Sequence, residues 1–170
     1  MTDDNQQITS LTQQTAARLI SRMAKDARTA QHILGQSDNA ARNAALSAAA
    51  AAIRASEPGI LSANQRDRAR GADAGLTDAF IDRLTLTPES IEAMAQGLDV
   101  IAQLDDPIGA ELASWTVSSG LDIARIATAL GVIGVIYESR PNVTVDAASL
   151  CIKSGNAALL RCGSDSQYTS

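Results

Sequence analysis

Two short polar segments in the C-terminal part of the chain carry residues whose side chains could form a binding site. The first is Glu138-Ser139-Arg140-Pro141-Asn142, and the second is Arg161-Cys162-Gly163-Ser164. Together they supply two guanidinium groups, two serine hydroxyl groups and a glycine. Guanidinium groups bind oxyanions through paired hydrogen bonds. The two segments therefore indicate an anion site, provided that the fold brings them to the same edge.

The residues around these segments show the pattern of a strand, a helix and a second strand. Val132 to Tyr137 is a short apolar run rich in β-branched residues, as is typical of a strand buried in a parallel sheet. A helical pattern from Val143 is closed by Gly155-Asn156, and a second apolar run covers Ala157 to Leu160. Ligands of open α/β sheets bind beyond the carboxyl ends of parallel strands. This βαβ unit thus predicts that the two polar segments meet at one edge.

The preceding part of the chain carries mainly helical patterns. Ile60 to Gly75 is charged and weakly periodic, so it predicts a partial helix followed by a loop. Alternation between Glu111 and Leu130 predicts a β-hairpin that turns at Ser118-Ser119-Gly120. The expected helices are an amphipathic one from Ile8 to Leu34, an alanine-rich one capped near Asp38 and ended by Pro58-Gly59, a short one after Thr77, and one that starts at Thr87-Pro88. We therefore divide the chain into a helical segment, 1–110, and a strand-containing segment, 111–170.

Composition excludes several classes of function. The chain has 170 residues, 45% of them hydrophobic, which is enough to bury a core. A net charge of −5 without a basic cluster argues against nucleic acid and anionic membranes as partners, and 2% aromatic residues leave few platforms for base stacking. The polar start lacks the pattern of a signal peptide, and two cysteines are ordinary for a reducing compartment. These features favour the cytoplasm.

The remaining chemically active side chains do not form a recognisable centre. Cys151 falls on the apolar face of the predicted crossover helix and is interpreted as a core residue. Cys162 lies next to Arg161 and could be reactive, although a structural role is favoured. His32 has no neighbours at metal-ligand spacing, so we expect no metal site and no Ser-His-Asp set.

One continuous run resembles a known family. IGVIYESRPNVTVDAASLCIKSGNAALLR is similar to the signature of the γ-glutamyl phosphate reductases, in the aldehyde dehydrogenase superfamily. The chain departs from the family pattern at Ala129, Cys162 and Asp165, where the family often has Pro, Gly and Glu. The resemblance implies an α/β fold of the aldehyde dehydrogenase type, in which an N-terminal helical layer precedes part of a Rossmann-like parallel sheet. It also implies that the chain is the N-terminal portion of an enzyme whose nucleophilic cysteine lies beyond Ser170.

The same resemblance implies an activity and roles for individual residues. The expected reaction is the NADPH-dependent reduction of L-glutamyl 5-phosphate to L-glutamate 5-semialdehyde and phosphate in proline biosynthesis, by an enzyme that is a homo-oligomer at full length. Arg140 and Asn142 would line the site for the substrate or its oxyanion. Arg161 would clasp the 2′-phosphate of NADPH. The expected cofactor contacts are Glu138, Ser139, Arg161, Gly163 and Ser164.

Two other classes of function stay open at this stage. Without the family resemblance, Arg161 would be a solvated strand end as often as a ligand. The chain could then be a non-catalytic module that binds a dinucleotide or a partner protein. The alanine-rich first half alone would also permit a purely structural helical protein.

Overall fold

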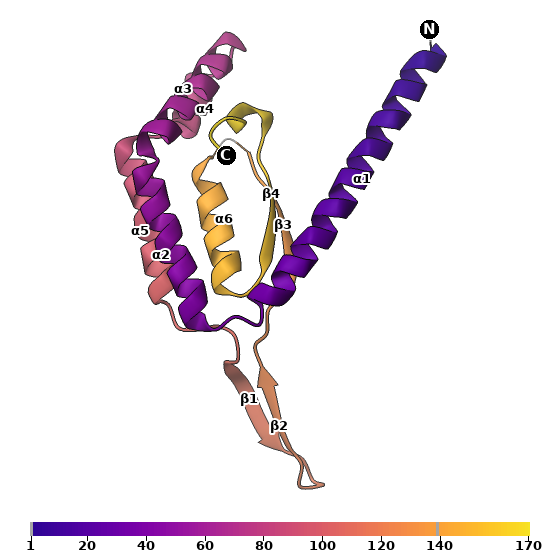
Figure 1. The fold of residues 1–170 in the computed structure, drawn as a ribbon, viewed down its shortest axis with the longest axis vertical. Coiled ribbons are helices and arrows are strands. Elements are labelled where there is room, and N and C mark those ends of the chain that lie inside the picture. The colour runs from indigo at the N-terminus through magenta and orange to yellow at the C-terminus, as the bar shows by residue number, and fades with distance from the viewer. Residues whose placement is uncertain (1, 139) are drawn as a thin grey trace.

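The described part of the chain, residues 2–138 and 140–170 of the computed structural model, contains a helical layer, a protruding hairpin and one βαβ unit (Figure 1). Side chains are described from residue 13 onward. The elements in chain order are α1 (Thr2–Leu34), α2 (Asn39–Ala55), α3 (Glu57–Asp73), α4 (Asp78–Leu84), α5 (Pro88–Gln103), β1 (Glu111–Thr116), β2 (Asp122–Ile126), β3 (Val132–Ile136), α6 (Asn142–Lys153), β4 (Ala157–Arg161) and a 3₁₀ helix (Ser164–Ser166).

The predicted βαβ unit is confirmed. β3 and β4 are parallel, with Val132 opposite Ala157 and Ile136 opposite Arg161, and α6 connects them. Both strands lie between α6 and the C-terminal part of α1 (Figure 1). Gly155 ends α6 with φ of 70°, and a Cβ at this position would overlap the side chain of Ile108. Glycine is therefore required here both by the left-handed backbone and by the close packing.

The helical layer is built on small side chains. α2 and α5 pack against each other through a buried cluster that the alanine-rich sequence of α2 makes possible. α6 packs on the same cluster through Val145 and Ile152. The predicted caps at Asp38 and Thr87 are confirmed, since Asp38 accepts from the Ala41 N–H at 2.7 Å and Thr87 forms a capping box with Ser90. Thr77 precedes α4 as predicted, but its side chain makes no capping hydrogen bond. The cluster consists of Leu46, Ala50, Ala95, Leu98 and Ala102.

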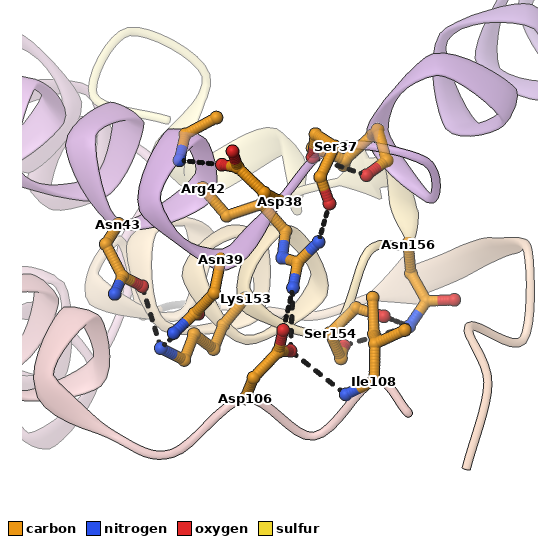
Figure 2. A network of polar contacts seen from close by, with 12 residues as sticks. Ser37, Asp38, Asn39, Arg42, Asn43, Asp106, Ile108, Lys153, Ser154 and Asn156 are labelled. Carbon is orange, nitrogen blue, oxygen red and sulfur yellow. Dashed lines mark hydrogen bonds and ion pairs between the residues drawn. The ribbon is translucent and has the colours of Figure 1, made fainter. Parts of the chain in front are cut away.

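A buried lysine joins α6 to this layer (Figure 2). Lys153 is 3% exposed, and its Nζ donates to Asn39 Oδ1 at 3.0 Å, Asn43 Oδ1 at 2.7 Å and the Ala102 carbonyl at 3.2 Å. The acceptors come from α2 and α5, so one ammonium group fixes the C-terminal end of α6 against both helices. All three acceptors are neutral oxygens.

A buried arginine supports the same junction (Figure 2). Arg42 on α2 is 2% exposed, and it forms two hydrogen bonds at 2.6 and 2.7 Å with the carboxylate of Asp106, in the loop after α5. It also donates to the Ser37 carbonyl. Burial acts to raise the pKa of the Asp106 carboxyl, but hydrogen bonds from the Ile108 N–H and from Arg42 outweigh burial and lower this pKa below its ordinary value.

The structure corrects one prediction and refines another. Residues Ile60 to Gly75 were expected to be helical only in part, but α3 is continuous from Glu57 to Asp73. α2 ends at Ala55, before Pro58, and α3 begins at Glu57. Pro58 therefore lies in the first turn of α3, where proline is tolerated. The predicted hairpin is present as β1 and β2, which form a sheet separate from β3 and β4 and project away from the body (Figure 1).

We expect Asp106→Ala to lower the free energy of unfolding by about 3 kcal/mol, near the low end of the range for breaking a buried pair, because Arg42 stays buried without its partner. The lowered pKa of Asp106 makes this contribution full above the ordinary carboxyl pKa, and it is lost as the pH falls through the lowered value. Urea unfolding at several pH values measures both effects. Asp105→Ala, at the exposed neighbouring position, is the control and should change stability little. Equal losses for the two variants would contradict a role for the ion pair.

Candidate functional site

The strand register brings the two polar segments to one edge of the parallel pair. Ile136, the last residue of β3, lies opposite Arg161, the last residue of β4. The Tyr137 N–H then donates to the Arg161 carbonyl at 3.1 Å, which extends the pairing by one step. Glu138 and Arg140 therefore leave the sheet beside Arg161. Ser139, which the sequence assigned to the cofactor, lies outside the described residues.

A groove of about 370 Å³ opens at the end of β3. It lies between α4 and the start of α6, and it combines exposed charged side chains with apolar walls. The Tyr137 hydroxyl lies 2.5 Å from Thr144 Oγ1, which fixes this ring against α6. We name this groove at the end of β3 the β3 groove. Its lining residues are Phe80, Arg83, Tyr137, Glu138, Arg140 and Val143.

Asn142 does not line the β3 groove. It is the first residue of α6, and its Nδ2 donates to Asp146 Oδ2 at 3.1 Å, one helical turn further on. The amide is thus engaged within its own helix. It could donate to a substrate oxygen only by giving up this hydrogen bond.

A second groove, of about 260 Å³, lies at the end of β4. It contains Ser164 and Asp165, and Phe80 lines both grooves, so the two grooves adjoin at this side chain of α4. Gly163 precedes Ser164, and a Cβ added to it would collide with the carboxylate of Asp165. Glycine is required here by this close approach and not by the backbone conformation, since a φ of −68° is ordinary for any residue. The remaining lining residues are Asp67, Arg70, Gly71, Ala74 and Leu76.

Arg161 is exposed and lines neither groove. Among residues 13–138 and 140–170, it has no carboxylate within ion-pair distance. Its guanidinium is therefore available to an anion at the strand edge. This position fits the predicted contact with a 2′-phosphate without testing it.

Two buried polar residues of α3 were missed by sequence reasoning: Asp67 holds the turn after β4, and Asn64 holds the end of α4. The Asp67 carboxylate accepts from the N–H groups of Tyr168 and Thr169 at 3.1 and 2.8 Å and from the Thr169 hydroxyl at 2.6 Å. Asn64 accepts from the Leu86 N–H and donates to the Leu84 carbonyl, both at 2.8 Å. The charged, weakly periodic sequence of α3 gave no signal for these long-range bonds.

The cysteines and the histidine form no catalytic centre in the described part of the chain. Cys151 is buried, as predicted, and burial raises the pKa of its thiol, which disfavours the reactive thiolate. Cys162 is half-buried, and His32 is exposed. No group of His, Cys, Asp or Glu among the described residues could hold a metal ion. No described helix combines the length and apolarity needed to cross a membrane.

Comparison with solved structures defines the class of fold. Two structures described as aldehyde dehydrogenases, from Bacillus subtilis and Listeria monocytogenes, superpose on 89% of this chain with TM-scores of 0.67 and 0.63, at 18% and 13% identity. The matched region is 31% of each of those chains. The chain therefore has an α/β fold of the aldehyde dehydrogenase type, of which it contains the helical layer and part of the parallel sheet.

The proteins that share more sequence identity with this chain are γ-glutamyl phosphate reductases. The γ-glutamyl phosphate reductase of Paramagnetospirillum magneticum is 54% identical over 152 residues, which is 89% of this chain and 36% of that protein. That of Rhodospirillum rubrum is 56% identical over 85% of this chain and 34% of that protein. Crystal structures of the γ-glutamyl phosphate reductases of Thermotoga maritima and Saccharomyces cerevisiae superpose on this chain with TM-scores of 0.82 and 0.83, at 38% and 37% identity. The superposed region covers 86% and 87% of this chain, and 35% and 38% of those two reductase chains.

The chain is thus a homologue of the γ-glutamyl phosphate reductases, and the resemblance found in its sequence is confirmed. It spans about 36% of the length of the first of these relatives. No family model matches it.

We expect Asp67→Ala to loosen the turn after β4, because the N–H groups of Tyr168 and Thr169 lose a charged acceptor. Hydrogen bonds to charged groups contribute about 1.5–3 kcal/mol, so the opening free energy of these two amides should fall by roughly that amount. Hydrogen exchange at Tyr168 and Thr169 measures this. Asp73→Ala, at the exposed end of α3, is the matched control. Unchanged exchange in the Asp67 variant would show that the turn does not depend on this carboxylate.

Proposed function

We propose that this chain forms the helical layer and the first cofactor-binding unit of a cytoplasmic NADPH-dependent γ-glutamyl phosphate reductase. The reaction would convert L-glutamyl 5-phosphate to L-glutamate 5-semialdehyde and phosphate in proline biosynthesis. One observation carries the proposal. In a chain that is 54% identical to a reductase of this name, the polar segments that would bind the ligand meet at the carboxyl edge of a parallel strand pair.

The residues at the end of β4 fit a nicotinamide dinucleotide. Arg161 offers an exposed guanidinium to an anion, and Ser164 offers a hydroxyl in the neighbouring groove. Gly163 lets the Asp165 carboxylate approach the backbone of the turn, where a Cβ would collide with it. The preference for NADPH rests on Arg161, because a guanidinium pairs well with a 2′-phosphate. The cofactor would supply the hydride when bound.

The residues at the end of β3 suit the substrate side. Arg140 lines the β3 groove, and Asn142 starts the adjoining helix, from which its amide could reach a developing oxyanion after leaving Asp146. The assignments of Glu138 and Ser139 to the cofactor stay predictions. Glu138 lines the groove of Arg140 and not that of Ser164.

The proposal places the nucleophile outside residues 1–170. The acyl phosphate must be attacked by a thiolate, and Cys151 is buried with a raised thiol pKa. Cys162 follows the strand end and is assigned a structural role. A cysteine beyond Ser170 would attack and phosphate would leave. Hydride transfer to the resulting thioester would then release the semialdehyde and return the thiolate.

The division at residue 110 and the assembly of the complete protein are also part of the proposal. The helical segment 1–110 would support the cofactor unit 111–170. A homo-oligomer would cover apolar side chains that the β1–β2 hairpin leaves exposed. These are Leu112, Trp115 and Ile126.

A chimera tests the proposed function. The matching 152-residue segment of the Paramagnetospirillum magneticum reductase would be replaced by the corresponding segment of this chain. We expect the chimera to catalyse phosphate-dependent oxidation of glutamate 5-semialdehyde with NADP⁺, the reverse of the proposed reaction, and the isolated chain to show no turnover. Cys162→Ser in the chimera is the control and should leave activity intact. A folded chimera without activity, or activity that depends on Cys162, would contradict the proposal.

The role of Arg161 is tested in the same chimera. Arg161→Ala should weaken NADPH binding by roughly 1.5–3 kcal/mol, the range for hydrogen bonds to charged groups, and should weaken NADH binding much less, because NADH lacks the 2′-phosphate. Arg161→Lys should be intermediate, since it keeps the charge without the paired geometry. Calorimetry with both cofactors gives the ratio of the two losses in affinity, and Arg68→Ala, at an exposed position of α3 outside both grooves, is the matched control. Equal losses for the two cofactors would assign Arg161 to the fold or to a shared ribose contact.

A further inference from the structure

The β3 groove contains a residue that the sequence did not connect with the site. Arg83, on α4, lies 54 positions before Tyr137 in the chain, yet both residues line this groove. Its Nε donates to the Ala79 carbonyl at 3.1 Å, and its guanidinium lies 5.7 Å from the centre of the Phe80 ring. These two contacts hold the start of the guanidinium while leaving its terminal N–H groups for a ligand.

The groove combines charges of both signs. Arg83 and Arg140 provide two guanidinium groups, and Glu138 provides one carboxylate. All three side chains are exposed, and none has an ion-pair partner among residues 13–138 and 140–170. Unpaired charges of opposite sign in one groove are the complement of a ligand that itself carries both charges.

Apolar side chains complete the complementarity. Phe80 and Val143 line the groove beside the charged groups, and they offer surface to a short methylene chain. A phosphoryl group alone suits the groove poorly, because Glu138 would repel its negative charge. An α-amino acid has a carboxylate, an ammonium group and a carbon chain, and the groove offers a counterpart to each.

We propose that the β3 groove binds the α-amino-acid end of the substrate, with Arg83 and Arg140 holding the α-carboxylate and Glu138 holding the α-ammonium group. This inference rests on the proposed function, adds Arg83 as a residue that determines substrate specificity, and assigns Glu138 to the substrate in place of the cofactor. The reacting acyl group would lie beyond the β3 groove, because Asn142, the proposed oxyanion donor, does not line it. The anionic end and the reacting end of the substrate are thereby assigned to different side chains.

Ligand titration of the 170-residue chain tests the groove without requiring catalysis. Amide shifts in NMR spectra would be followed with L-glutamate, with glutarate, which lacks the ammonium group, and with 4-aminobutyrate, which lacks the α-carboxylate. We expect saturable shifts around Arg83 and Arg140, and weaker binding of both analogues. Arg83→Gln should raise the Kd for L-glutamate roughly tenfold or more, as expected for a lost hydrogen bond to a charged group.

Two further variants sharpen the titration. Glu138→Gln should weaken binding of L-glutamate but not of glutarate, because only the former has an ammonium group for Glu138. Arg68→Ala, at an exposed position of α3 outside both grooves, is the control and should bind normally. Absence of saturable shifts in the groove, or equal binding of L-glutamate and inorganic phosphate, would overturn the inference.

Kinetics of the chimera separate this inference from the proposed function. In an active chimera, Arg83→Gln should raise the KM for glutamate 5-semialdehyde roughly tenfold with a much smaller change in kcat, and Arg83→Lys should restore part of the loss. An unchanged KM would overturn the inference while the proposed function stands. An inactive chimera would overturn the proposed function, and the titration of the isolated chain would still decide whether the groove binds an amino acid.

Discussion

The arrangement of this chain depends on one buried ammonium group. Lys153 ends α6, and its charge is removed from water among the side chains of Asn39 and Asn43 and the carbonyl of Ala102. A buried charge is tolerated only when its hydrogen bonds are made, so α2 and α5 cannot shift relative to α6 without a large cost. Because α6 connects β3 to β4, the same constraint sets where the carboxyl ends of both strands lie.

The composition explains why a polar group has this role. The cluster between α2 and α5 contains three alanines and two leucines, and small side chains allow close packing without the directional fit of large ones. Hydrogen bonds from Lys153, and those from Arg42 to Asp106, supply the direction that the alanines lack. Lys153 lies on α6 and bonds to α2 and α5, and Arg42 lies on α2 and bonds to the loop after α5, so the apolar packing and the polar network position the same three helices.

The local features of the fold could be predicted from sequence, whereas the buried polar contacts could not. Gly155, the cap at Thr87 and the apolar runs of β3 and β4 depend on neighbouring residues, and each was identified correctly. The burial of Lys153 and Asp67 depends on partners about one hundred positions away, and charged residues are ordinarily exposed. For the same reason, the sequence predicted only the part of the candidate site that belongs to the βαβ unit. The polar segments after β3 and β4 were found, but Arg83 was missed, because nothing local indicates that α4 lies at the strand ends.

The position of α4 follows from one face of α3. Asn64 and Asp67 are three residues apart, so their side chains lie on the same side of that helix, and both are buried. Asn64 holds the Leu84 carbonyl and the Leu86 N–H, which fixes the exit of α4 and with it Phe80 and Arg83. Asp67 holds the N–H groups of Tyr168 and Thr169, which fixes the turn that follows Ser164. The groove at the end of β3 and the groove at the end of β4 therefore share a single support. A displacement of α3 would change both grooves at once, which couples the proposed amino-acid site to the proposed cofactor site.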